Sequence, residues 1–447
     1  MAEIRPFQAL RYNSQLVSPS QVVTQPYDKI TPATQERYYA ASPYNLVRII
    51  LGRREPSDNT VENVYSRAAA FAHDWRERDI LRRDSDPSIY ACSQTFTSPT
   101  DGTKHERRGF VALGRVEDYS ARVVFRHEQT LAKPKADRLD LLRATRTHFE
   151  QLFLLYEHSG EIDSLIAPKP GTPPTIDVTD EYGVENRVWQ ISDPAIVAAI
   201  QKAMADKKLV IADGHHRYET ALNFRNENRG AADASVRGNA TGTNPDVHDP
   251  DAPYEFVMLT FVNMNDPGLI VLPTHRIVHS LNSFSADEFQ RAAREFFEIE
   301  VIDAALDAAQ ATELLRARGR TGTAFLAVTA NRIYLLRSTK APASKFFHGL
   351  SPQQQSLDVV QLHKCLLEGV LRLSEESIRN QENLSYLRDA AEAIAQVRKG
   401  EADIAFLMNP CPVQKVRDIA FAGEVMPQKS TDFYPKLLSG LTAYALD

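Results

Sequence analysis

Apolar positions along the chain alternate between helical spacing and strand spacing. One helix is predicted where apolar residues fall three and four apart on a single face, at Val61, Val64, Tyr65, Ala68, Phe71, Ala72 and Trp75. Another begins at Asp193-Pro194, where Asp caps the helix and Pro takes its first position; Ile196, Ile200 and Met204 follow as its apolar stripe. Continuous apolar runs at 152–156 and 254–263 predict buried strands.

Turn residues divide other segments into hairpins. Strands at 88–96 and 108–116 flank Asp101-Gly102, and strands at 323–329 and 332–337 flank Ala330-Asn331. Further helices are predicted from the capping pattern of Ser285 with Glu288 and over 137–149, 359–373 and 384–398, and a short strand over 405–408. The mixture of helices and hairpins predicts an α+β fold.

A change of composition suggests how the chain is divided. Residues 226–253 are rich in Gly, Asn, Asp and Ala and contain few apolar side chains. Such a segment gains little from burial, so we predict a mobile loop over 228–253. This loop separates a domain at 1–227 from a C-terminal α+β domain at 254–447.

Composition and charge exclude several classes of protein. The 447 residues are enough for two or three domains, and 43% hydrophobic with 25% charged residues is ordinary for a soluble globular protein. A net charge of −6 without a long basic run argues against nucleic-acid binding. We found neither an apolar signal region nor a membrane-length apolar run, so we expect a cytoplasmic protein. Three scattered cysteines favour neither a zinc site nor a disulfide framework.

The strongest chemical signal is the stretch 209–222, which predicts a strand, a sharp turn and the start of a helix. The turn contains Asp213, Gly214, His215, His216 and Arg217. Adjacent basic groups resist joint burial, whereas an anion at a helix N-terminus would stabilise them. Asp213 then serves as a general base or a magnesium ligand, and His215 as a second catalytic group. Alternatively, Asp213 only caps the helix and the histidines are solvated.

The segment 212–221 resembles the signature of a mainly bacterial family, domain of unknown function 1015. Further segments similar to blocks of that family lie at 6–12, 25–28, 42–48, 127–130, 134–138, 272–276, 357–359 and 426–430. The resemblance therefore extends along nearly the whole chain.

The Asp-Gly-His-His-Arg turn is also similar to the phosphate-binding turn of the ParB/sulfiredoxin superfamily, which includes free-serine kinases. This resemblance implies a ParB/sulfiredoxin-like nucleotide-binding part in 1–227, with His216 and Arg217 as phosphate ligands. It also implies ATP or ADP, with magnesium, as cofactors. His215 stands where sulfiredoxins have their reactive Cys, which argues against sulfinic-acid repair.

Other polar clusters have two interpretations each. His127 and Glu128 could line the site, with Glu128 as a proton carrier and His127, Lys133 and Arg138 as nucleotide ligands, or they could belong to a solvated loop. Lys429 could belong to a second phosphate clamp or to a surface loop. A buried His275 bonded to the backbone is the common outcome for its position, whereas the adjacent Arg276 would require an anion.

These observations favour nucleotide-dependent phosphoryl transfer to a small hydroxyl metabolite, since that chemistry needs phosphate neutralisation more than a covalent nucleophile. Walker and protein-kinase signatures are missing from the sequence. Two alternatives stay open: a nucleotide-binding switch without transfer, and a metal-dependent phosphohydrolase.

Overall fold

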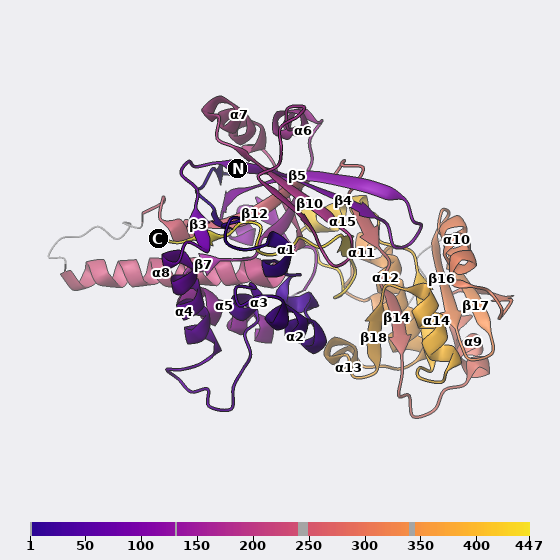
Figure 1. Cartoon of the computed structure of the whole chain (residues 1–447). Coiled ribbons are helices and arrows are strands. Elements are labelled where there is room, and N and C mark those ends of the chain that lie inside the picture. Colours follow the sequence, from indigo (N-terminus) through magenta and orange to yellow (C-terminus); the bar gives the residue numbers. More distant parts are fainter. Residues whose placement is uncertain (1, 130–131, 240–248, 339–344) are drawn as a thin grey trace. The chain divides into compact units, whose positions relative to one another are not determined.

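A computed structural model describes residues 2–129, 132–239, 249–338 and 345–447 (Figure 1). These residues form two compact units, and each unit is discontinuous in sequence. Unit 1 comprises Met1–Phe125, Thr130–Leu269 and Pro435–Asp447, and unit 2 comprises Arg126–Gln129 and Ile270–Tyr434.

Unit 1 is built on a mixed sheet of nine described strands. Eight of them lie in the order β6-β11-β8-β12-β5-β4-β10-β9, and β1 pairs with β5. Their bounds are β1 Ile4–Arg5, β4 Ile89–Thr97, β5 Lys104–Arg115, β6 Val124–Phe125, β8 Leu152–Tyr156, β9 Ile176–Thr179, β10 Glu185–Ile191, β11 Leu209–Asp213 and β12 Phe256–Asn263. The pairs β12–β8 and β11–β6 are parallel and the others are antiparallel.

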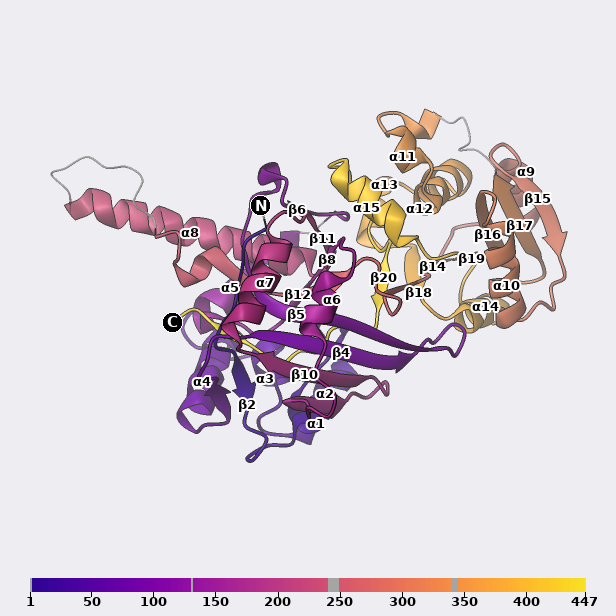
Figure 2. The same cartoon turned by 90° about the horizontal axis from the view of Figure 1, so that it is seen from above.

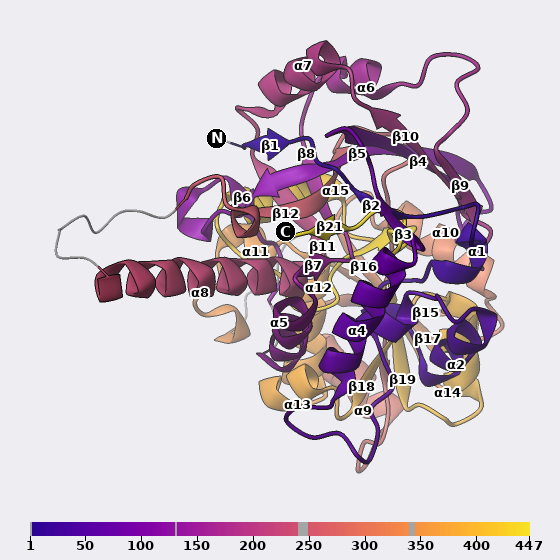
Figure 3. The same cartoon turned by 60° about the vertical axis from the view of Figure 1, so that its left-hand side comes forward.

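Side chains alternate between the two faces of this sheet, because the pleat repeats every two residues. Phe110, Leu154 and Leu259 face one side, where helices α6 (Glu161–Ile166) and α7 (Pro194–Met204) cover them. Figures 1 and 3 show these two helices side by side on that face. Val111 and Met258 face the other side and pack with residues from both ends of the chain, among them Phe7, Val23, Leu438 and Leu441.

A second core in unit 1 is helical and surrounds Trp75, which is 1% exposed. It draws on α3 Val47–Ile50, α4 Val64–Glu77 and α5 Ala132–Thr145. This unit also contains helices α1 Pro19–Val22, α2 Pro32–Ala41 and α8 His215–Asn239, the 3₁₀-helices η1 Tyr27–Lys29, η2 Tyr119–Ala121 and η3 Pro253–Glu255, and the strand pair β2 Leu10–Tyr12 and β3 Leu81–Arg83.

The C-terminal residues return to unit 1 and are fixed along their length. Strand β21 (Tyr444–Ala445) pairs with β7 (Thr147–His148), and Ser439 and Ala443 bond to backbone near the N-terminus. The Asp447 side chain forms ion pairs with Arg76 and Arg83. Residues 435–447 are therefore an integral part of unit 1.

Unit 2 contains an antiparallel sheet in the order β15-β17-β16-β19-β14-β18 (Figure 2). Its strands are β14 His275–Val278, β15 Glu298–Ile302, β16 Thr323–Val328, β17 Ile333–Ser338, β18 Leu384–Leu387 and β19 Ile404–Met408; β13 Ile270–Leu272 and β20 Asp432–Tyr434 form a separate pair. Helices α10 (Ala308–Arg318) and α14 (Ala390–Arg398) pack on the face that carries Ile277. The remaining helices are α9 Ala286–Ala293, the 3₁₀-helix η4 Lys345–Phe347, α11 Pro352–Gln355, α12 Asp358–Gln361, the π-helix η5 Leu362–Val370, α13 Glu375–Asn380 and α15 Val413–Phe421.

Elements with a strong local pattern were predicted correctly. The α+β class, the β4–β5 and β16–β17 hairpins, β8, α4 and α7 all lie where the sequence indicates. Helix α4 starts after its Asn63 cap, so Val61 lies outside it and is 76% exposed.

Several expectations about single elements need correction. Helix α5 ends at Thr145 and not near 149, because Arg146 takes a left-handed φ of 46° and Thr147 enters β7. The segment 384–398 starts as strand β18, which pairs with β14, before Asp389 caps α14. The helical segment expected over 359–373 divides into α12 and a π-helix.

The structure also differs from the loop expected at 228–253 and from the C-terminal domain expected to begin at 254. Helix α8 continues to Asn239, and within it Arg229 pairs with Glu255; residues 240–248 of the expected loop lie outside the described residues. Strand β12, expected to open the C-terminal domain, instead lies between β8 and β5 in the sheet of unit 1. In the described residues, no helix is long and apolar enough to cross a membrane.

The first prediction concerns His275, which is 3% exposed and whose Nδ1 accepts a hydrogen bond of 3.3 Å from the Met408 N–H. Burial, helped by the charge of Arg276, lowers the pKa of His275 from 6.5 to about 4. As the pH falls, His275 is protonated in the unfolded chain at a higher pH than in the folded protein. The free energy of unfolding should therefore fall as the pH drops from about 6.5 towards 4. His275→Gln should weaken this dependence by up to about 1.4 kcal/mol per pH unit.

Hydrogen exchange of the β14 and β19 amides, measured between pH 7 and 4.5, reports the stability of unit 2 separately from that of unit 1. Identical pH dependence in wild type and His275→Gln would show that His275 titrates normally in the folded protein.

Candidate functional site

The turn between β11 and α8 depends on one glycine. Gly214 adopts a φ of +94°, a left-handed conformation that disfavours any residue with a Cβ. A Cβ at this position would also lie 3.2 Å from Nε and Nη2 of Arg217. Gly214 thus lets the strand turn sharply into the helix while the Arg217 side chain folds back over the turn.

Asp213, at the end of β11, holds two cations with its two carboxylate oxygens. Its Oδ2 accepts from Arg217 Nη2 at 2.8 Å, and its Oδ1 accepts from Lys436 Nζ at 2.7 Å. All three side chains are largely buried, at 20%, 11% and 10% exposure respectively. Burial alone would raise the pKa of Asp213, but the charges of Lys436 and Arg217 outweigh it and hold that pKa well below its usual range. Such a carboxylate is a poor general base at neutral pH.

Two further cations act on the same carboxylate. The charge of Lys29 also lowers the pKa of Asp213. Arg107 is 2% exposed, and it donates to the Pro435 carbonyl at 2.6 Å and to the Gln94 side chain. Burial lowers the pKa of Arg107 to about 10, and the charge of Asp213 works against that change. One carboxylate thus interacts with the charges of Arg217, Lys436, Lys29 and Arg107.

Arg217 is fixed by more than Asp213. Its Nη1 donates to the Gln151 carbonyl at 2.6 Å and lies 4.0 Å from Glu150 Oε1. Glu150 also accepts from the Tyr27 N–H at 3.0 Å and lies 3.6 Å from Arg138 Nη1. Glu150 therefore lies between the guanidinium groups of Arg138 and Arg217, within ion-pair distance of both but hydrogen-bonded to neither.

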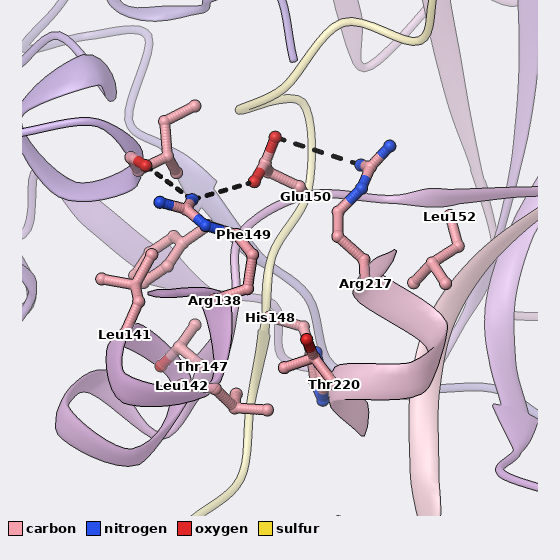
Figure 4. A pocket seen from close by; sticks show the side chains of 11 residues that line it. Arg138, Leu141, Leu142, Thr147, His148, Phe149, Glu150, Leu152, Arg217 and Thr220 are labelled. Atoms are coloured by element: carbon pink, nitrogen blue, oxygen red, sulfur yellow. Dashed lines mark hydrogen bonds and ion pairs between the residues drawn. The ribbon is translucent and has the colours of Figure 1, made fainter. Parts of the chain in front are cut away.

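A pocket opens beside this group (Figure 4). Its empty space is about 420 Å³, open solvent at its mouth included. The side chains that line it are Ile50, Arg138, Leu141, Leu142, Thr147, His148, Phe149, Glu150, Leu152, Arg217 and Thr220. Figure 4 shows Glu150 between Arg138 and Arg217, joined to each by an ion pair. Burial lowers the pKa of His148 to about 4, so this imidazole is neutral near pH 7.

The structure brings together most of the site residues predicted for unit 1. Asp213, Gly214 and Arg217 form the turn, Arg138 lines the adjoining pocket, and His215, 9% exposed, starts α8. His216 follows on the first turn of α8 and is half-buried. The backbone of Lys133 lies in α5.

The other predicted residues, His127, Glu128 and Lys429, belong to unit 2 and lie together there. His127 Nε2 lies 2.8 Å from Thr431 Oγ1, and Glu128 Oε1 accepts from the Lys429 N–H at 2.9 Å. They form a cluster of their own, and their assignment as nucleotide ligands or as a proton carrier stays a prediction.

The sequence did not indicate Glu150. It indicated Lys436 only as part of the segment considered for a second phosphate clamp with Lys429, and Tyr27 only as part of a turn near the site. Lys436 lies 223 residues from Asp213, so no local pattern connects the two. The block at 25–28, which resembles the family, contains Tyr27.

Magnesium does not fit Asp213 in this arrangement, because Arg217 and Lys436 occupy both of its oxygens. Among the described residues, no three His, Cys, Asp or Glu side chains are placed to hold a metal together. We therefore assign no step of the chemistry to a metal held by Asp213.

Several solved structures are similar to this chain at low identity. A conserved hypothetical protein from Pyrococcus furiosus has 14% identity and a TM-score of 0.32, over 70% of this chain and 87% of its own. A free serine kinase in complex with AMP has 14% identity and a TM-score of 0.33, over 70% and 83%. SbnI from Staphylococcus aureus, with a C-terminal truncation, has 10% identity and a TM-score of 0.34, over 75% and 88%. At TM-scores this low, these likenesses say nothing about what this chain binds.

Sequence comparison identifies the family. No curated protein matches the chain. The family model described as "Protein of unknown function (DUF1015)" matches residues 4–360, which is well over half of the sequence. The chain therefore belongs to the DUF1015 family, as the signature at 212–221 predicted.

Proposed function

We propose that the β11–α8 turn binds the phosphates of ATP or ADP, and that the protein transfers a phosphoryl group to a hydroxyl group of a small metabolite. The observation that carries this proposal is the Asp213 carboxylate, which holds Arg217 and Lys436 beside the first turn of a long helix. The first N–H groups of a helix have no intrahelical partner and favour anions. Two cations held at that position suit a polyphosphate.

The pocket beside Arg217 supports binding of the rest of the nucleotide. Its apolar side chains, among them Leu141, Leu142 and Phe149, suit a base, and neutral His148 can exchange hydrogen bonds without a charge to neutralise. Arg217 and Thr220 lie three residues apart on α8, so they share one helix face along which a nucleotide extends.

The chemistry follows from charge and position. The acceptor oxygen bonds to the terminal phosphorus, the bond from that phosphorus to its bridging oxygen breaks, and the nucleotide leaves one phosphate shorter. Arg217, Lys436 and His216 neutralise the phosphate oxygens. We assign the hydroxyl proton to His215, because the lowered pKa of Asp213 makes that carboxylate a poor acceptor.

The direct test follows phosphate labelled at the terminal position of ATP. Purified protein, magnesium and pooled hydroxyl metabolites should yield a labelled organic product. Label found only as free phosphate supports the phosphohydrolase alternative, and label that stays on the nucleotide supports the switch.

Arg217→Ala should weaken ATP binding by about 1.5–3 kcal/mol, the usual effect of losing a charged hydrogen bond. Arg217→Lys keeps the charge but loses the planar fork, so we expect an intermediate loss. Calorimetric titration gives the Kd, and thermal unfolding without nucleotide controls for folding. An unchanged Kd in a folded Arg217→Ala protein would falsify the phosphate site.

Gly214→Ala should lower nucleotide affinity because the new Cβ both strains the turn and displaces the Arg217 guanidinium. Gly102→Ala is the matched control, since Gly102 has a φ of +68° and a Cβ added there would meet nothing within 4 Å. Each substitution should cost about 1–2 kcal/mol of stability from backbone strain. Only Gly214→Ala should change the Kd for ATP, and equal Kd values in the two variants would contradict the geometry.

Asp213→Asn should destabilise unit 1 by about 3 kcal/mol, because one neutral amide cannot compensate two buried cations. If Asp213 only capped the helix, Asn would replace it almost without loss. Asp193→Asn is the control, since exposed Asp193 caps α7 by accepting from Ala195 and Ile196. Both tryptophans, Trp75 and Trp189, lie in unit 1, so urea unfolding followed by fluorescence reports this unit. Equal losses in the two variants would support the capping role alone.

A further inference from the structure

Unit 2 contains a fully buried guanidinium group for which the described residues provide no ion-pair partner. Arg276 lies in β14 at 0% exposure. Since side chains alternate along a strand, Arg276 points away from the face that carries Ile277 and its α10–α14 cover. A buried charge is unfavourable unless it is paired, so this position needs an explanation.

The hydrogen bonds of Arg276 leave it only partly satisfied. Nη1 donates to the Thr274 carbonyl and lies 3.1 Å from Met408 Sδ, and Nη2 donates to the Lys429 carbonyl at 3.1 Å. The guanidinium carbon lies 5.3 Å from the centre of the Tyr386 ring. Nε is buried and has no hydrogen-bond partner among the described residues. Burial lowers the pKa of Arg276 to about 10, so the group remains charged at neutral pH.

A second unsatisfied group lies close enough to interact with this charge. His363 is 6% exposed, and its Nε2 is buried without a hydrogen-bond partner in the described part of the chain. Burial lowers the pKa of His363 well below its usual range, and the charge of Arg276 lowers it further. The neutral imidazole still carries one N–H donor. His363 lies in the π-helix η5, a distortion that occurs frequently at functional sites.

The carboxylate that acts on Arg276 already accepts a hydrogen bond. Glu128 acts on Arg276 electrostatically, but its Oε1 accepts the Lys429 N–H at 2.9 Å. Lys429 is exposed and has a left-handed φ of +58°. Its N–H donates to Glu128 and its carbonyl accepts from Arg276, so the Lys429 backbone joins these two residues.

Three sequence blocks that the proposed function does not use meet here. They are 127–130, 272–276 and 426–430, and they are joined by the bonds of Glu128, Arg276 and Lys429. A purely structural arginine would explain the turn at 427–431, but it would not explain the unsatisfied groups on both Arg276 and His363.

We infer that unit 2 has a binding site for a small oxyanion, a carboxylate or phosphate group of a small molecule, at Arg276, with His363 and Lys429 as further ligands. The anion would complete the hydrogen bonds of Arg276 and His363 and neutralise the buried charge. This inference does not depend on the nucleotide site of unit 1.

The test uses the full chain with Arg217→Ala as background, which weakens phosphate binding at the candidate site of unit 1, and it follows peptides of unit 2 only. Inorganic phosphate, acetate and glycolate are titrated at constant ionic strength against chloride. Hydrogen exchange of the peptides covering 274–278 and 426–431 is the readout. We expect phosphate or the carboxylates to give saturable protection from exchange. The anion that gives half of the full protection at the lowest concentration is the preferred oxyanion.

Arg276→Gln should weaken that binding by about 10- to 100-fold, as expected for a charged hydrogen bond. His363→Leu leaves the buried charge of Arg276 in place and should weaken anion binding several-fold. This variant keeps the test informative where Arg276→Gln fails to fold. Arg388→Gln is the matched control, since Arg388 pairs with Asp432 in the same unit. The inference is overturned if none of the three anions gives saturable protection, or if His363→Leu and the folded Arg276 variant bind as the background does.

Discussion

The two ion pairs of Asp213 are the interaction on which the candidate site of unit 1 depends. Asp213 ends a strand in the interior of the sheet, Arg217 lies on the first turn of the following helix, and Lys436 comes from the returning C-terminal segment. Two segments of the chain that lie 223 residues apart therefore meet at one carboxylate. The left-handed Gly214 makes this contact feasible, since any side chain there would press against the Arg217 guanidinium.

This contact also changes the chemistry that the turn can perform. A free aspartate at the end of a strand suits a base or a metal ligand, whereas Asp213 is held as an anion by its cations. In the proposed function, Asp213 positions Arg217 and Lys436 for a ligand with more negative charge than one carboxylate, and the proton transfer falls to another group.

Local patterns in the sequence predicted the local structure well. The spacing around Trp75, the cap at Asp193 and the strand–turn–helix at 209–222 each depend on residues a few positions apart. Contacts over long distances along the chain were not predictable in this way. Nothing in 254–263 indicates that β12 lies between β8 and β5, and nothing near Lys436 indicates Asp213 as its partner. The sequence did not predict that α8 continues to Asn239, because this part of the helix is polar. The residue that pairs with its Arg229, Glu255, lies beyond the end of the helix.

The two units share one physical feature, a buried or half-buried positive charge that their own carboxylates do not fully compensate. Proteins lose stability by retaining such groups, and binding sites are a common reason for retaining them. Crystallographic difference density for a non-hydrolysable ATP analogue would show where the phosphates bind. We expect phosphate oxygens within hydrogen-bonding distance of the first N–H groups of α8, Arg217 and Lys436. Phosphates bound elsewhere, with the Asp213 ion pairs unchanged and the turn empty, would contradict this expectation.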